Sequence, residues 1–122
     1  AGGIPIWVSG TVNARVVRRI ADYGSGWIPW GPDGADLGSS IPRLRALVAD
    51  AGGDPSFQVQ GHAPVVMGSD GAVDIAATLD ESTAMIEAGV TDLRVPAGAP
   101  ASREAALDLY SRWSEAFGAR FR

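Results

Sequence analysis

The chain has 122 residues, of which 46% are hydrophobic and 20% charged, and its formal net charge is −4. This composition is typical of one soluble globular domain with a modest core, so residues 1–122 are expected to form a single domain. The acidic balance argues against nucleic acid and against an anionic membrane as partners, and no apolar run approaches the roughly 20 residues that span a bilayer. The chain has no cysteine, which excludes disulfides and zinc–thiolate sites and fits a cytoplasmic location.

The first predicted strand is the short apolar run Ile4–Val8, which has the pattern of a strand buried on both faces. Ser9, Gly10 and Thr11 break this run, and we expect them to form a tight turn that opens a helix. Gly24 would end that helix. A glycine turn between a buried strand and a helix leaves backbone N–H groups free, which makes it a ready site for a phosphate.

A helix, a glycine and a strand then recur in the same order along the chain. Gly24, Gly52 and Gly89 each follow a predicted last helical turn, at the position that favours a left-handed backbone. The strands predicted after these glycines are Gly26–Trp30, Phe57–Ala63 and Asp92–Val95.

The predicted helices have the period of amphipathic helices with one buried face. Ser39 or Ser40 is the expected N-cap of the second, the segment 78–81 is a capping box that opens the third, and Ser102 is the expected cap of the fourth. The residues expected to face inward are Val12, Val16, Val17, Ile20, Ile41, Leu44, Val48, Ala51, Leu79, Ser82, Thr83, Ile86, Ala106, Tyr110, Trp113 and Phe117.

The resulting order of alternating strands and helices predicts an α/β fold with a parallel sheet, because helical crossovers join parallel strands. Two architectures accommodate it. An arc of a β/α barrel would place the four strands side by side in sequence order, whereas an open doubly wound sheet would have the order 2-1-3-4.

The sequence resembles that of the bacterial-luciferase-like monooxygenases, which are FMN- or deazaflavin-dependent oxidoreductases built on a TIM barrel. The segments that carry the resemblance are IPIWVSG, ARVVRRIADYG, SGWIPW, ATLDESTAMIEAGVTDLRVP and EAALDLYSRWSEAF. Ser25 stands where an Asp is common in the family. The resemblance implies half of a TIM (β/α)8 barrel, with four parallel βα units that correspond to strands five to eight and with the N-terminal half absent.

The resemblance also implies that Ser9, Gly10 and Thr11 hold the phosphate of FMN or of a deazaflavin coenzyme in the complete protein. The family pattern at this turn is Gly-Gly or Ala-Gly, so Ser9 departs from it mildly. The alternative is an ordinary βα turn. Trp30, at the exit of the second predicted strand, would line a flavin pocket or be buried in an interface.

Two further residues are candidate substrate ligands. Period-2 alternation places Gln58, Gln60 and His62 on one face of their strand, which in a barrel would be the lumen. His62 would then contact substrate or cofactor, and the alternative is a polar side chain that faces solvent or makes a subunit contact. Arg94, inside the last strand, would bind a phosphate or carboxylate of a small-molecule substrate, and the alternative is an ion pair with Asp92 or Asp74. No metal site is predicted.

These observations lead to two hypotheses of function. The first is the C-terminal part of a flavin- or deazaflavin-dependent oxidoreductase or monooxygenase, inactive in isolation and with its catalytic residues in the missing half. The second is a non-catalytic half-barrel that self-associates. Under either hypothesis, the chain is expected to pair with its own missing N-terminal half or with a second copy, burying the first strand and the inner face near Trp7 and Val59.

Overall fold

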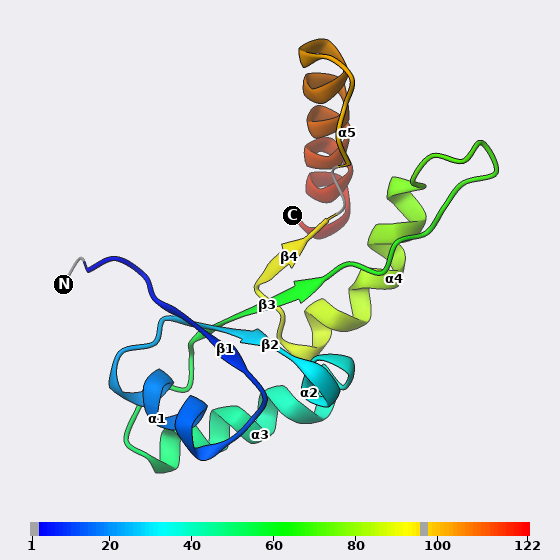
Figure 1. Cartoon of the computed structure of the whole chain (residues 1–122). Coiled ribbons are helices and arrows are strands. Elements are labelled where there is room, and N and C mark those ends of the chain that lie inside the picture. Colours follow the sequence, from blue (N-terminus) through cyan, green and yellow to red (C-terminus); the bar gives the residue numbers. More distant parts are fainter. Residues whose placement is uncertain (1–2, 96–97) are drawn as a thin grey trace. The chain divides into compact units, whose positions relative to one another are not determined.

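The structure is a computed structural model that describes residues 3–95 and 98–122, and it has an α/β architecture (Figure 1). Its elements are β1 (Trp7–Gly10), α1 (Ala14–Asp22), β2 (Gly26–Pro29), α2 (Gly31–Ala35), α3 (Leu37–Asp50), β3 (Gln58–His62), α4 (Ile75–Ala88), β4 (Asp92–Arg94) and α5 (Arg103–Phe121). The chain divides into two compact units. Unit 1 runs up to Gly61 and includes Met85–Leu93, and unit 2 comprises His62–Ala84 and Arg94–Arg122. No helix in the described part of the chain is long and apolar enough to cross a membrane.

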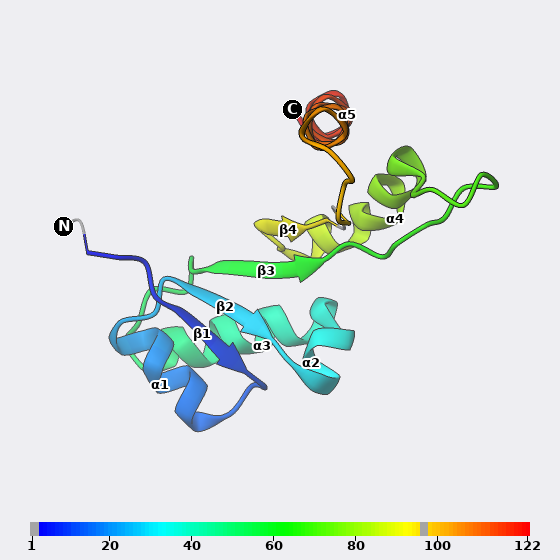
Figure 2. The ribbon, with the colours of Figure 1, turned by 45° about the horizontal axis from the view of Figure 1, so that its top comes forward.

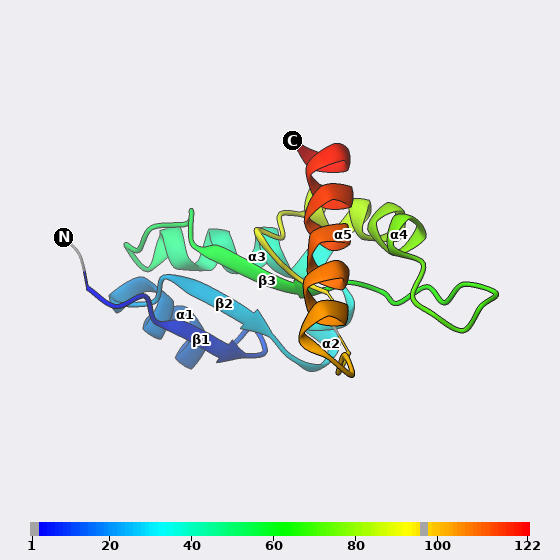
Figure 3. The ribbon, with the colours of Figure 1, turned by 90° about the horizontal axis from the view of Figure 1, so that it is seen from above.

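The four strands lie in the order β1-β2-β3-β4, and Figure 3 shows β1, β2 and β3 side by side. The first pair is parallel from Trp7↔Gly26 to Gly10↔Pro29, and the second is parallel from Gly26↔Gln58. The predicted parallel sheet and its sequential order are therefore confirmed, and the order 2-1-3-4 is excluded. Sequential order is what an arc of a β/α barrel requires.

The start of the first strand was predicted wrongly. Ile4 is 90% exposed and Ile6 is 47% exposed, and β1 begins only at Trp7. Pro5 has no N–H to donate to a ladder, which disfavours a strand over this segment. As a result Ser9 and Gly10 belong to β1, and the connection to α1 is made by residues 11–13 instead.

The core of unit 1 lies between the sheet and two helices. Val8, Trp27 and Val59 are partners across the three strands, and each is at most 5% exposed. The helices α1 and α3 lie side by side on this face (Figure 2). Their buried residues are Val16 and Ile20 of α1 and Leu37, Ser40, Ile41, Leu44 and Val48 of α3. Because Val59 is already buried here, it does not lie on an open inner face as expected.

The glycines that follow the first three predicted helices do not all act in the same way. Gly52 has φ +84° and Gly89 has φ +115°, so the left-handed conformation is confirmed at both. Gly24 does not have a positive φ. A Cβ at Gly24 would lie 2.7 Å from the Cα of Ile20, so glycine is required there by close backbone approach instead.

The segment between β2 and the second predicted helix is itself helical. It contains the short helix α2 and the first turn of α3, which begins at Leu37 with Asp36 as its N-cap residue. Neither Ser39 nor Ser40 is the cap. Ser40 is buried, and its hydroxyl donates to the carbonyl of Asp33 at 2.7 Å, which fixes α2 against α3. Pro42 consequently lies inside α3 rather than in its first turn.

In unit 2, the predicted capping box at 78–81 is wrong, because α4 begins earlier, at Ile75. The side chain of Asp74 accepts from the Ala77 N–H at 2.9 Å, and Thr78 is fully buried inside the helix. The cap of α5 is confirmed, since Ser102 accepts from the Ala105 N–H. Along α5, Trp113 is buried, but Tyr110 is 51% exposed and does not face inward as predicted.

Candidate functional site

The residues predicted to hold a cofactor come together where β1 and β2 end. Gly10 is paired with Pro29, and Trp30 follows directly as the N-cap residue of α2. The methyl group of Thr11 lies 3.6 Å from the position that a Cβ on Gly31 would take. Because carboxyl ends of parallel strands form one edge of a sheet, this edge is where ligands bind in β/α folds.

Gly10 occupies a position that only glycine fits. Its φ is +144°, and a Cβ there would lie 3.0 Å from Cγ2 of Val16. Its carbonyl accepts a hydrogen bond of 2.9 Å from the indole N–H of Trp27, a residue with no exposed surface. The backbone at the end of β1 is therefore held firmly and carries no side chain that would keep a ligand away.

Two N–H groups in the first turn of α1 are already bonded within the chain. The side-chain oxygen of Asn13 accepts from the N–H groups of Arg15 and Val16 at 3.0 and 3.1 Å. Asn13 is thus an N-cap of the preferred type, and it satisfies two of the N–H groups that a helix start would otherwise leave free. The helix α1 also begins later than expected. Its N-cap residue is Asn13, so the helix does not start directly after Thr11.

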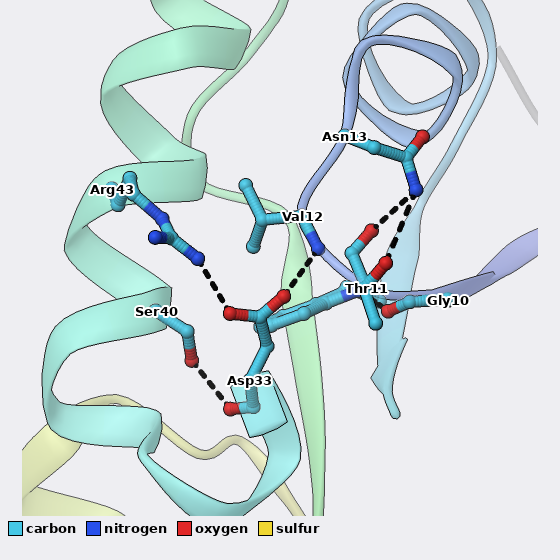
Figure 4. A network of polar contacts seen from close by, with 8 residues as sticks. Gly10, Thr11, Val12, Asn13, Asp33, Ser40 and Arg43 are labelled. Carbon is cyan, nitrogen blue, oxygen red and sulfur yellow. Dashed lines mark hydrogen bonds and ion pairs between the residues drawn. The ribbon is translucent and has the colours of Figure 1, made fainter. Parts of the chain in front are cut away.

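The N–H of Val12, just before this cap, donates to a carboxylate of the chain itself (Figure 4). Its acceptor is Oδ2 of Asp33, on α2, at 2.6 Å. The other carboxylate oxygen of Asp33 forms an ion pair of 2.5 Å with Nη2 of Arg43. The Asp33 side chain is only 15% exposed. A negatively charged oxygen therefore already lies against the turn that follows β1.

The aromatic and basic side chains near this edge point to solvent. Trp30 is 63% exposed. Arg15, Arg18 and Arg19 of α1 are exposed as well, as is usual for arginines on a solvated helix face.

The predicted substrate ligands lie in the other unit. His62 and Arg94 belong to unit 2, and both are exposed. The N–H of Ala63 donates to the carbonyl of Arg94 at 2.9 Å, so the ends of β3 and β4 are joined there. Along β3, Gln58 and His62 are exposed but Gln60 is buried. The predicted cofactor residues and substrate residues are thus divided between the two units.

Two hollows in the described part of the chain are lined by none of the predicted site residues. One of about 670 Å³ in unit 2 is lined by Asp70, Asp74, Arg112 and Glu115, among others. Another, of about 500 Å³, is an apolar groove between α1 and α3. Among residues 3–95 and 98–122, no group of three or more acidic or histidine side chains could hold a metal ion.

Sequence reasoning missed Asn13, Asp33 and Arg43. An Asn three residues before the first buried helical position is an N-cap signal and would have located Asn13. Asp33 and Arg43 are ten residues apart, and their contact depends on α2, which no sequence pattern indicated. Comparison of the chain with protein-family models, with curated proteins and with solved structures finds no match.

Proposed function

We propose that this chain is the C-terminal half of a flavin- or deazaflavin-dependent oxidoreductase or monooxygenase of the luciferase-like kind. In this proposal the connection after β1 receives the phosphate of FMN or of the deazaflavin coenzyme. The observation that carries it is the hydrogen bond of 2.6 Å from the Val12 N–H to the Asp33 carboxylate. This amide is directed at an anionic oxygen beside the carboxyl end of a parallel strand, as a phosphate-binding amide would be.

The residues at this edge fit a phosphate group. Gly10 has no side chain to block its approach, and the N–H of Val12 and the guanidinium of Arg43 both already contact one carboxylate. Trp30, the N-cap residue of α2, is 63% exposed and would offer an aromatic surface to a flavin ring. A bound flavin would supply the hydride or oxygen chemistry, and this chain would bind and orient its phosphate end.

The remainder of the barrel must come from elsewhere in this proposal. The four strands would be the fifth to eighth of a TIM barrel, and β1 would be an open edge because its described partner is β2 alone. The missing N-terminal half, or a second copy of the chain, would pair with this edge. Most of the pocket for the ring and for a small-molecule substrate, and the catalytic residues, would lie in that half, and His62 and Arg94 would serve the substrate. A cytoplasmic location goes with this function.

Binding of FMN compared with riboflavin tests the proposal, because the two differ only in the phosphate. We expect the isolated chain to bind FMN more weakly than micromolar and to bind riboflavin more weakly still. Gly10→Val should abolish this difference, whereas Gly52→Val, at another glycine with positive φ, should leave it unchanged. Equal affinity for FMN and riboflavin, or micromolar binding of either by the monomer, would contradict the proposal.

A non-catalytic, self-associating half-barrel is the second candidate. It is favoured by the exposed Ile4 and Ile6, which continue the open edge of β1. The coding sequence that precedes residue 1 separates the two candidates. About four further βα units there would support the enzyme, and an initiator codon directly before residue 1 would support the self-associating module.

A further inference from the structure

We infer that Asp33 is an internal competitor for the phosphate site, so that a phosphate binds only when this carboxylate leaves the Val12 N–H. The inference rests on the proposed function and adds a mode of regulation to it. The carboxylate holds the two donors that a phosphate would use. Oδ2 accepts from Val12, and Oδ1 is paired with Arg43 (Figure 4).

Only one partner of this ion pair is shielded from water. The Asp33 side chain is 15% exposed, whereas the Arg43 side chain is 56% exposed and remains in contact with solvent. Both bonds of the Asp33 carboxylate are charge-assisted, since the acceptor is ionised. A free phosphate must therefore displace a well-placed carboxylate before it can occupy the turn.

The carboxylate can leave without unfolding of the segment that carries it. Ser40 donates to the main-chain carbonyl of Asp33 and not to its carboxylate, so this bond persists when the side chain rotates. The helix α2 has five residues and includes Gly31, at φ +57°, and Gly34. A short helix with two glycines is weakly stable by itself, so its side chains are readily rearranged.

Once Asp33 has turned away, the site gains a second, charged donor. Arg43 is 56% exposed and is held in place by α3, so its guanidinium is free to pair with an incoming phosphate. Arginine binds phosphate through two parallel N–H bonds, which an amide alone cannot supply. When phosphate replaces the carboxylate, α2 would lose its contact with the Val12 N–H. Arg43 would still have an anionic partner, because the phosphate takes the place of Asp33.

Titration of the 15N-labelled chain with inorganic phosphate, followed at the Val12 amide, tests the inference. Asp33→Asn keeps the size of the side chain and removes its charge, and it should bind phosphate roughly tenfold more tightly than the unmodified chain. Asp36→Asn is the matched control, because it makes the same change of charge three residues away at a residue with no side-chain cap bond. Its affinity should stay within about twofold of the unmodified chain. Asp33→Asn combined with Arg43→Gln should lose the gain.

The outcomes separate the two claims. Equal phosphate affinity of Asp33→Asn and the unmodified chain would overturn the competition and leave the proposed function standing. An equal gain in Asp33→Asn and Asp36→Asn would also overturn it, because the effect would then be one of net charge. If no variant shifted the Val12 amide at any phosphate concentration, both the inference and the proposed function would fail.

Discussion

The indole N–H of Trp27 donates to the carbonyl of Gly10 at 2.9 Å, and this bond ties the end of β1 to the centre of the neighbouring strand. Trp27 has no exposed surface, and its partners across the sheet are Val8 and Val59. The residue that anchors the core of unit 1 therefore also fixes the backbone from which the candidate phosphate turn starts.

Trp27→Phe is expected to lower the free energy of unfolding by about 2 kcal/mol. The change removes the hydrogen bond, leaves the Gly10 carbonyl without this donor and creates a small cavity. Trp30→Phe is the control, because Trp30 is 63% exposed, and it should change stability by less than about 0.5 kcal/mol. Urea denaturation measures both, and similar losses for the two variants would contradict the assignment of Trp27 as an anchor.

Gly10→Ala is expected to destabilise the chain by about 2 kcal/mol, because its φ of +144° is strained for any residue with a Cβ, which would also meet Val16 at 3.0 Å. Gly52→Ala, at φ +84°, meets no atom within 4 Å and should cost about 1 kcal/mol. The comparison by thermal or urea unfolding isolates the packing contribution. A greater loss at Gly52 than at Gly10 would show that the end of β1 is more open than described.

Thr78→Val tests the role of the Thr78 hydroxyl, which is buried inside α4 and does not cap the helix as predicted. Its Oγ1 accepts from the Val66 N–H at 3.0 Å, and valine has the same shape without an acceptor. We expect a loss of about 1 kcal/mol, since the part-buried N–H of Val66 would lose its acceptor. Thr83→Val is the control, because that hydroxyl makes only long bonds, donating to the Leu79 carbonyl and accepting from Arg120, both at 3.4 Å. Hydrogen exchange of the Val66 amide should rise in the first variant alone, and unchanged exchange there would refute the bond.

The carboxyl group of Asp54 gives a prediction on pH. Hydrogen bonds from the side chain and then the backbone N–H of Ser56 hold the pKa of Asp54 below its ordinary value of 3.8. Because the folded pKa is lowered, the stabilisation is present above about pH 3.8 and is lost as the pH falls through the folded value. Ser56→Ala should raise the pKa of Asp54 towards 3.8, as measured by carbon NMR of the carboxyl group. An unchanged pKa would contradict the assigned cause, and Ser114→Ala on α5 is the control.

The open edge of β1 predicts that the isolated chain associates. Ile6 is 47% exposed where it continues this edge, so Ile6→Lys should reduce association by placing a charge there. Leu47→Lys introduces the same charge on α3, where Leu47 is 40% exposed, and should leave association unchanged. Light scattering at micromolar concentration measures the mass. If the unmodified chain were a monomer, the claim that the open edge of β1 pairs with another chain would be wrong.

The order of helices and parallel strands could be predicted from sequence because it depends on local periodicity. Apolar residues at helical spacing located the buried faces of α1 and α3, and Ser102 located the start of α5. The boundaries that failed were set by tertiary contacts. Thr78 looked like a cap, yet its hydroxyl serves Val66, and Asp74 caps the helix instead.

The connection that follows β1 could be located from the sequence, but the bonds made by its N–H groups could not. Gly10, the last residue of β1, marked the end of the strand, because a residue without a side chain is favoured where the backbone takes φ +144°. The Val12–Asp33–Arg43 contact could not be foreseen, since it joins three segments through a short helix that contains two glycines and a proline. Local propensity does not favour such a helix, and the bond from Ser40 holds it.

Residue-resolved NMR of the chain with FMN, and separately with riboflavin, tests the central claim most directly. The account predicts that FMN shifts the backbone amides from Gly10 to Val12 and the indole signal of Trp27, whose N–H is bonded to Gly10. Riboflavin, which lacks the phosphate, should leave these signals in place. Identical shifts from both ligands, or FMN shifts confined to other parts of the chain, would show that the turn after β1 is not a phosphate site.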